Sequence, residues 1–217
     1  TVTARPRPED LDGVEVRCFD PDAAEAMVTE IKEAARDGDS LGGVVEVLAY
    51  GVPVGLGSHV HWDRKIDALL AQALMSIQAV KGVEIGNGFE VAGRRGSEGH
   101  DPITWSGDAP NAGGYVRESS LAGGVEGGIT SGELVVARAA MKPLASLNRP
   151  VLKTVDTVSK EETVSFKERT DVTAVPAMGV VAETMTALVL ATEALRKFGG
   201  DSLPELERNH AAFLASL

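Results

Sequence analysis

The sequence predicts an α+β protein in which a sheet packs against long helices. Short apolar runs typical of strands recur along the chain, two long segments have helical periodicity, and one segment has the pattern of a hairpin. Strands and helices do not alternate regularly, which disfavours a doubly wound fold. A chain of 217 residues is long enough to bury a sizeable core.

The first quarter of the chain predicts a strand, a helix and a second strand. Residues 14–19 alternate between apolar and polar side chains, as a short strand does. Residues 20–38 carry helix signals at both ends, with Asp20 as the N-cap and Gly38 as the stop. Residues 42–55 form an apolar run bounded by glycine and proline, which predicts a strand.

The middle of the chain predicts a helix, a loop and a glycine-rich segment before a strand. Residues 63–82 have apolar side chains at three- and four-residue spacing, so we expect a helix there. Residues 93–114 are polar and rich in glycine, and we expect an exposed, mobile loop. Residues 121–132, LAGGVEGGITSG, contain five glycines and precede the predicted strand 133–143. Because glycine is costly to order, this segment is either a loose connector or a place where something approaches bare main chain.

The last third predicts a hairpin followed by two helices. Residues 154–169 have the pattern of a hairpin with its turn near residues 159–161. Residues 175–200 predict a long helix with little polar face, which we therefore expect to be deeply buried. Residues 201–217 predict a final helix.

The charge of the chain limits its partners. A formal net charge of −11 argues against nucleic acid and anionic membrane surfaces as partners. Any anionic ligand must therefore be held by a local cluster of cations. The single cysteine, Cys18, excludes an internal disulfide and fits a reducing cytosol, so we expect a cytoplasmic protein. We see no signal peptide, and no uninterrupted apolar run reaches the ~18 residues of a membrane span.

Two segments contain residues suited to an anion site. Lys142 follows an apolar strand in MKPLAS, where its ammonium group and neighbouring main-chain N–H groups could hold an anion; a solvated lysine is the alternative. Arg169 and Asp171 lie two residues apart and would share one face of an extended segment. They would bind an anion and transfer a proton, or else form a surface ion pair contributing about 0–1 kcal/mol.

Other site types find little support. His59 and His61 would lie on one face of a strand, but no third ligand is near, so we expect exposed histidines and no metal site. The sequence has no G-x-x-x-x-G-K-[ST] loop, no dinucleotide-binding glycine motif between a strand and a helix, and no G-x-S-x-G elbow.

Four blocks in one order resemble the chorismate synthase family: LMSIQAVKGVEIGNGF, AGGVEGGITSG, AAMKPLAS and ERTDVTAVPAMGVVAETMTALVLA. The resemblance extends from about residue 38 to the end of the chain. It implies a β-α-β sandwich of antiparallel sheet with long packed helices, usually assembled as a homotetramer. It also implies a lyase of the shikimate pathway of aromatic amino acid biosynthesis. Such enzymes convert 5-enolpyruvylshikimate-3-phosphate to chorismate and phosphate by 1,4-elimination.

The resemblance also implies a cofactor, reduced FMN, with NADPH as the reductant in some members. The implied flavin contacts are Gln78, Ala79, Gly127, Lys142, Pro143, Leu144, Ala145, Ser146 and Arg169. Asp171 matches an aspartate placed near the flavin N5, where it assists proton movement. Under this interpretation Gly127 and its neighbours lack side chains because the flavin or its phosphate lies against their main chain.

Family chains are about twice as long, and their N-terminal half supplies two catalytic histidines and several phosphate-binding arginines. The histidines here do not match those motifs; they are His59, His61, His100 and His210. Ser120 stands where the family often has asparagine. We therefore expect residues 1–217 to be the C-terminal part of one domain, needing the N-terminal segment to act on its small anionic substrate. The alternatives are a non-catalytic assembly or flavin-binding fragment, and another anion-binding enzyme that uses the KPLAS loop.

Overall fold

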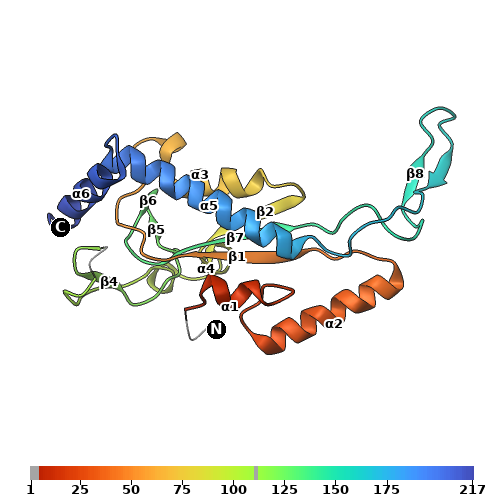
Figure 1. The fold of residues 1–217 in the computed structure, drawn as a ribbon, viewed down its shortest axis with the longest axis horizontal. Coiled ribbons are helices and arrows are strands. Elements are labelled where there is room, and N and C mark those ends of the chain that lie inside the picture. Colours follow the sequence, from red (N-terminus) through yellow and green to blue (C-terminus); the bar gives the residue numbers. More distant parts are fainter. Residues whose placement is uncertain (1–4, 110–111) are drawn as a thin grey trace. The chain divides into compact units, whose positions relative to one another are not determined.

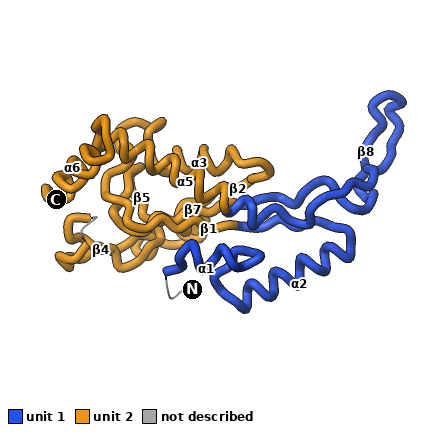
Figure 2. The backbone as a smooth tube through the Cα atoms, in the orientation of Figure 1, with its two compact units in different colours: residues 1–44, 140–179 blue, residues 45–139, 180–217 orange. Residues whose placement is uncertain are grey.

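The computed structural model describes residues 5–109 and 112–217. Two compact units are present (Figure 2). Unit 1 consists of residues 1–44 and 140–179, and unit 2 consists of residues 45–139 and 180–217.

Unit 1 begins with two helices, α1 (Pro8–Asp12) and α2 (Pro21–Asp37). Asp20 caps α2, because its Oδ1 accepts hydrogen bonds from the amides of Asp22 and Ala23 at 3.0 and 3.1 Å. Gly38 ends α2 with φ 68°, so both predicted helix signals are confirmed. The predicted strand over residues 14–19 is wrong: Arg17 has φ 52° and its amide donates to Val14 O, so the chain turns there.

The predicted hairpin of unit 1 is confirmed. Strands β8 (Lys153–Val155) and β9 (Glu162–Val164) pair antiparallel, with Thr154 opposite Thr163. The Asp156 carboxylate organises the turn by accepting hydrogen bonds from the amides of Val158 and Ser159 at 2.8 and 2.7 Å.

Unit 2 contains a three-stranded sheet in the order β1 (Gly43–Ala49), β7 (Val135–Met141), β2 (Val80–Ile85). Helices α3 (Ile66–Met75) and α5 (Val175–Phe198) lie along one side of this sheet (Figure 1). The ends of β1, β7 and α5 extend into unit 1. Helices packed on a sheet, together with antiparallel hairpins, confirm the predicted α+β class.

The remaining elements of unit 2 are short apart from the last helix. They are η1 (Trp62–Arg64), α4 (Gly88–Val91), η2 (Gly96–Glu98), β3 (Ile103–Trp105), β4 (Tyr115–Arg117), β5 (Val125–Glu126), β6 (Ile129–Thr130) and α6 (Leu203–Leu214). β3 pairs with β4 and β5 with β6, both antiparallel. The expected loop over residues 93–114 therefore contains η2 and β3, and its residues 110 and 111 lie outside the described part of the chain.

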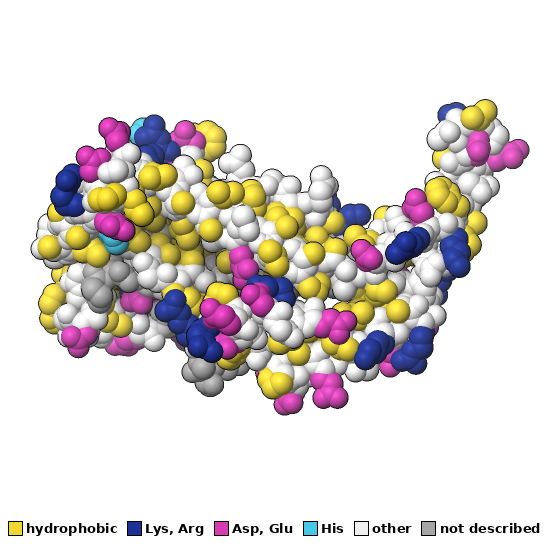
Figure 3. Space-filling view, in the orientation of Figure 1, with side chains coloured by type: hydrophobic (Ala, Val, Ile, Leu, Met, Phe, Trp, Pro, Cys, Tyr) yellow, Lys and Arg dark blue, Asp and Glu magenta, His cyan; other side chains and the backbone are white. Residues whose placement is uncertain are grey.

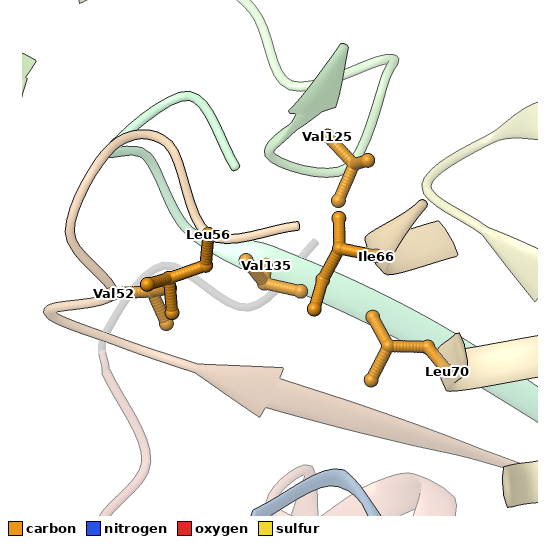
Figure 4. Packing of buried hydrophobic residues seen from close by; sticks show 6 residues of the cluster. All are labelled: Val52, Leu56, Ile66, Leu70, Val125 and Val135. Carbon is orange, nitrogen blue, oxygen red and sulfur yellow. The ribbon is translucent and has the colours of Figure 1, made fainter. Parts of the chain in front are cut away.

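The core of unit 2 is an aliphatic cluster of residues from the first half of the unit, 45–139 (Figure 4). It consists of Val52, Leu56, Ile66, Leu70, Val125 and Val135. A fully buried hydroxyl lies beside it: Thr130 Oγ1 donates to Pro53 O at 2.6 Å and accepts from the Leu56 amide at 2.9 Å. These two bonds fix the segment after β1 against β6 without leaving the hydroxyl unpaired.

The expected deep burial of the long apolar helix is wrong. Residues Val189 and Leu190 of α5 pack against the core cluster, but Val180 and Leu188 are 46% and 57% exposed. Hydrophobic side chains are visible on the outer surface over this helix (Figure 3). By length and composition alone α5 could cross a membrane, a test that core helices of soluble proteins also pass. The apolar pattern predicts that the helix is hydrophobic on most sides. It does not predict which of those sides other parts of this chain bury.

Candidate functional site

The first two implied flavin contacts, Gln78 and Ala79, form the turn between α3 and β2. The Val80 amide donates to Ile77 O at 3.2 Å, and Ala79 has φ 66°. Such a turn normally places glycine at its third position. α3 spans Ile66–Met75 and ends before this turn, so the predicted helix over residues 63–82 is too long. Left-handed backbone at a non-glycine residue costs about 1–2 kcal/mol, and such strain clusters at functional sites.

Replacing Ala79 by glycine tests this strain. We expect Ala79→Gly to raise the free energy of unfolding by about 1 kcal/mol. Glycine adopts the left-handed conformation without the steric penalty that alanine has there. The greater conformational entropy of glycine in the unfolded chain offsets only part of this gain. Urea unfolding followed by circular dichroism measures the change. Lys160→Gly is the matched control, since Lys160 has φ 64° in the β8–β9 hairpin. A loss of stability in Ala79→Gly, with a gain in the control, would show that the Ala79 methyl group matters more than the strain.

The glycine-rich segment 121–132 is threaded through a crowded part of unit 2. A Cβ atom on Gly123 would lie 2.4 Å from Gly86 Cα, one on Gly124 2.3 Å from Leu134 O, and one on Gly128 2.7 Å from Ser58 O. The protein's own main chain therefore requires these three glycines, which corrects the expectation that a flavin explains them. Gly127 differs: it is exposed and has φ 60°, and a Cβ atom on it would have no described atom within 4 Å.

Gly127 and Gln78 lie at opposite ends of α3. The amide of Ile66, the first residue of α3, donates to Gly128 O at 2.9 Å, whereas Gln78 follows the last turn. Ten helical residues rise by about 15 Å. Unit 2 therefore holds two separate groups of implied flavin contacts, and a ligand touching both would have to span the length of the helix.

In unit 1 the predicted anion loop, residues 142–146, is held by the segment that precedes β1. Ser40 is buried, and its Oγ donates to Leu144 O at 2.6 Å. A Cβ atom on Gly42 would lie 2.4 Å from Met141 O and 2.9 Å from the Pro143 ring. The absence of a side chain at Gly42 thus allows this segment, residues 40–42, to lie directly against the loop.

The same segment also holds the stretch that contains Arg169 and Asp171. The Leu41 amide donates to Val172 O at 2.7 Å. A second bond closes the arrangement, because the Glu168 amide donates to Leu147 O at 3.2 Å. In unit 1, therefore, the segment 40–42 contacts both the anion loop and the stretch that contains Arg169 and Asp171.

The charged groups of this arrangement are exposed and uncompensated. Lys142, Arg169 and Asp171 are exposed, and none has an ion pair or side-chain hydrogen bond with the described residues 5–109 and 112–217. The surface ion pair between Arg169 and Asp171, the alternative from sequence, does not form in this part of the structure. By contrast, Arg149 in the same unit pairs with Asp39. Lys142 and Arg169 are thus two unpaired cations on stretches held by the same segment, 40–42. An anionic ligand needs such local positive charge in a chain of net charge −11.

All four histidines belong to unit 2. His59 and His61 are exposed in the segment before η1, and the ring of His210 lies against that of Phe198 with centroids 4.7 Å apart. Within the described residues no three His, Cys, Asp or Glu side chains are placed to hold a metal ion.

Sequence reasoning missed the supporting residues Ser40, Gly42 and Asp101. The only local signal for the first two is the run SLGG before a strand, which is equally typical of an ordinary turn. Asp101, which binds the start of the glycine-rich segment, lies in the stretch we expected to be a mobile loop.

Fold and loops together define a class: an α+β protein that presents open main chain and unpaired cations suited to an anionic ligand. Comparison with known proteins gives the family. The chorismate synthase family model matches residues 6–195. The chain is 59% identical over 209 residues to the chorismate synthase of Streptomyces coelicolor and 58% identical over 216 residues to that of Salinispora tropica. This chain belongs to the chorismate synthase family.

A solved structure agrees with this assignment. A crystal structure of chorismate synthase superimposes with a TM-score of 0.78 at 44% identity, over 96% of this chain and 53% of that one. The two relatives are matched over 96% and 98% of this chain but only 52% and 54% of their own length. The chain therefore spans about half the length of its relatives. The family match also begins earlier, at residue 6, than the resemblance from about residue 38 that the sequence motifs indicated.

Proposed function

We propose that this chain carries part of the flavin site of a chorismate synthase. The whole enzyme would convert 5-enolpyruvylshikimate-3-phosphate to chorismate and phosphate by 1,4-elimination, with reduced FMN as cofactor and NADPH as a candidate reductant. The observation that carries the proposal is the family match over residues 6–195, which includes every implied site residue. A cytoplasmic homotetramer and a need for the other half of the enzyme belong to the same proposal.

The donor groups of the chain fit a flavin phosphate and ring. The exposed ammonium group of Lys142 and the guanidinium of Arg169 would neutralise phosphate oxygens, since neither is used by an ion pair within the described residues. Ser146, at the end of the anion loop, would add a hydroxyl donor. The exposed main chain at Gly127 would leave room for a flat ring, because no side chain stands there.

Reduced FMN, when bound, supplies electron density that helps an allylic phosphate to leave, and the protein supplies the surroundings. The exposed Asp171 carboxylate would hold a proton beside the cofactor.

The test is FMN binding by the complete enzyme. The matched segment of the Streptomyces coelicolor relative is replaced by this chain to give a full-length chimera, and flavin fluorescence is titrated. We expect Lys142→Gln and Arg169→Gln each to raise the FMN dissociation constant by about 10- to 100-fold, the loss of one charge-assisted hydrogen bond of about 1.5–3 kcal/mol. Lys160→Gln, at the tip of the β8–β9 hairpin, is the control and should bind normally. Equal binding by all three variants would contradict the proposed anion site.

A second candidate, a non-catalytic flavin-binding or assembly fragment, is favoured by the histidines, because none matches the family's catalytic motifs. An assembly fragment would not bind FMN. A flavin-binding fragment would bind it, so turnover by the chimera is what separates that candidate from the proposed function. If this chain carries part of the site and the other half of the enzyme carries the rest, the chimera should form product and residues 1–217 alone should form none.

A further inference from the structure

Asp101 binds the start of the glycine-rich segment from a position 20 residues earlier in the chain. Its Oδ1 accepts a hydrogen bond from Ser119 Oγ and one from the Leu121 amide at 2.8 Å, and its Oδ2 accepts one from the Ala122 amide at 2.9 Å. Asp101 lies just before β3, and Ser119 follows β4. One carboxylate thus closes the base of the β3–β4 hairpin and fixes residues 119–122.

The fixed residues lead directly to the Gly127 turn. Ala122 O accepts a hydrogen bond from the amide of Val125, the first residue of β5, at 3.4 Å, and β5 ends at Glu126. The other end of this stretch is also held from the hairpin base, because Arg117 Nη2 donates to Glu126 Oε2 at 2.8 Å. Residues 121–126 are therefore clamped at both ends, and Gly127 is the next residue.

The Asp101 carboxylate acts as a charged acceptor. Partial burial raises its pKa, but the hydrogen bonds from Ser119 and from the amides of Ala122 and Leu121 outweigh burial and leave the pKa below its ordinary value. Hydrogen bonds to an ionised carboxylate are stronger than those to a neutral acceptor.

We infer that Asp101 is a positioning residue for the flavin site, holding the Gly127 turn in the conformation that leaves its main chain open. This inference rests on the proposed function. Asp101 acts through residues 119–126. Without its three hydrogen bonds the segment samples other conformations, and a ligand that binds only the competent one loses affinity in proportion to the competent fraction.

The experiment measures FMN binding and its rates by stopped-flow fluorescence in the chimera carrying Asp101→Asn. The amide keeps the size of the side chain but removes the charge and places an N–H₂ group against main-chain donors. We expect the dissociation constant to rise about tenfold, equivalent to about 1.4 kcal/mol. The rise should come from slower association with an unchanged dissociation rate, because only the free protein's competent fraction falls.

Two further variants make the result interpretable. Asp20→Asn removes a carboxylate that accepts two main-chain amides at the start of α2, and it should leave FMN binding unchanged. Ser119→Ala removes one of the three donors to Asp101 and should slow association by about two- to threefold; it decides the question if Asp101→Asn fails to fold. Unchanged FMN binding in the Asp101 and Ser119 variants would overturn the inference, as would weaker binding caused only by faster dissociation. Absence of FMN binding by the unsubstituted chimera would instead overturn the proposed function.

Discussion

Replacing Gly124 by alanine is expected to lower the free energy of unfolding by roughly 3–5 kcal/mol. The new Cβ atom would lie 2.3 Å from Leu134 O and 2.8 Å from Leu134 C, both main-chain atoms that cannot rotate away. Gly124 also has φ 73°, where alanine is strained. Since natural domains are stable by only about 5–15 kcal/mol, urea unfolding should show a large fall in the transition midpoint.

Gly127→Ala is the matched control for this prediction. Gly127 has a similar φ of 60° but open space around it, so alanine there meets only the backbone penalty and should cost about 1 kcal/mol. Equal losses in the two variants would show that the contact with Leu134 is unimportant. Because Gly127→Ala keeps the fold, any loss of FMN affinity in this variant reports on contact with the ligand itself.

Asp171→Asn is expected to lower kcat of the chimera by about 100-fold or more, the range in which one acid–base group contributes to catalysis. Asparagine keeps the size of the side chain but cannot hold a proton. Asp171 makes no side-chain hydrogen bond or ion pair with the described residues, so its replacement should leave stability unchanged. The FMN dissociation constant should stay within about threefold of its original value.

The control for this variant is Asp108→Asn in the segment between β3 and β4, which should have normal turnover. An unchanged kcat in Asp171→Asn would show that this carboxylate does not move a proton in the reaction. It would leave the anion site formed by Lys142 and Arg169 to be judged by FMN binding.

Local signals were sufficient for several elements. Asp20 and Gly38 mark both ends of α2 because capping depends on residues next to each other in the chain. The β8–β9 hairpin was predictable for the same reason, since its turn is closed by Asp156 within the turn itself. Local signals failed where a single backbone angle redirects the chain. Arg17 has a left-handed conformation where a strand was predicted, and Ala79 has one within the range predicted to be helical.

The implied flavin contacts could be named from sequence motifs. The residues that hold those contacts in place could not. Ser40 and Leu144 are 104 residues apart, and Asp101 and Ala122 are 21 apart, so no local pattern connects them. Their partners are main-chain atoms, which carry no residue-specific signal. The clamp on residues 121–126 and the segment that holds the anion loop could therefore be found only from coordinates.

By itself the sequence determined the α+β class, the caps of α2, the β8–β9 hairpin and the family. The caps and the hairpin depend on residues close together in the chain, and the family was indicated by four blocks in one order, each of them a continuous stretch of sequence. Only the tertiary structure showed why the glycine-rich segment lacks side chains. Gly123 lies against the turn after β2 and Gly124 against main chain at the start of β7, and Gly127 alone of the three faces open space. The physical reason is that close approach is a property of two segments at once, whereas a sequence presents each segment separately.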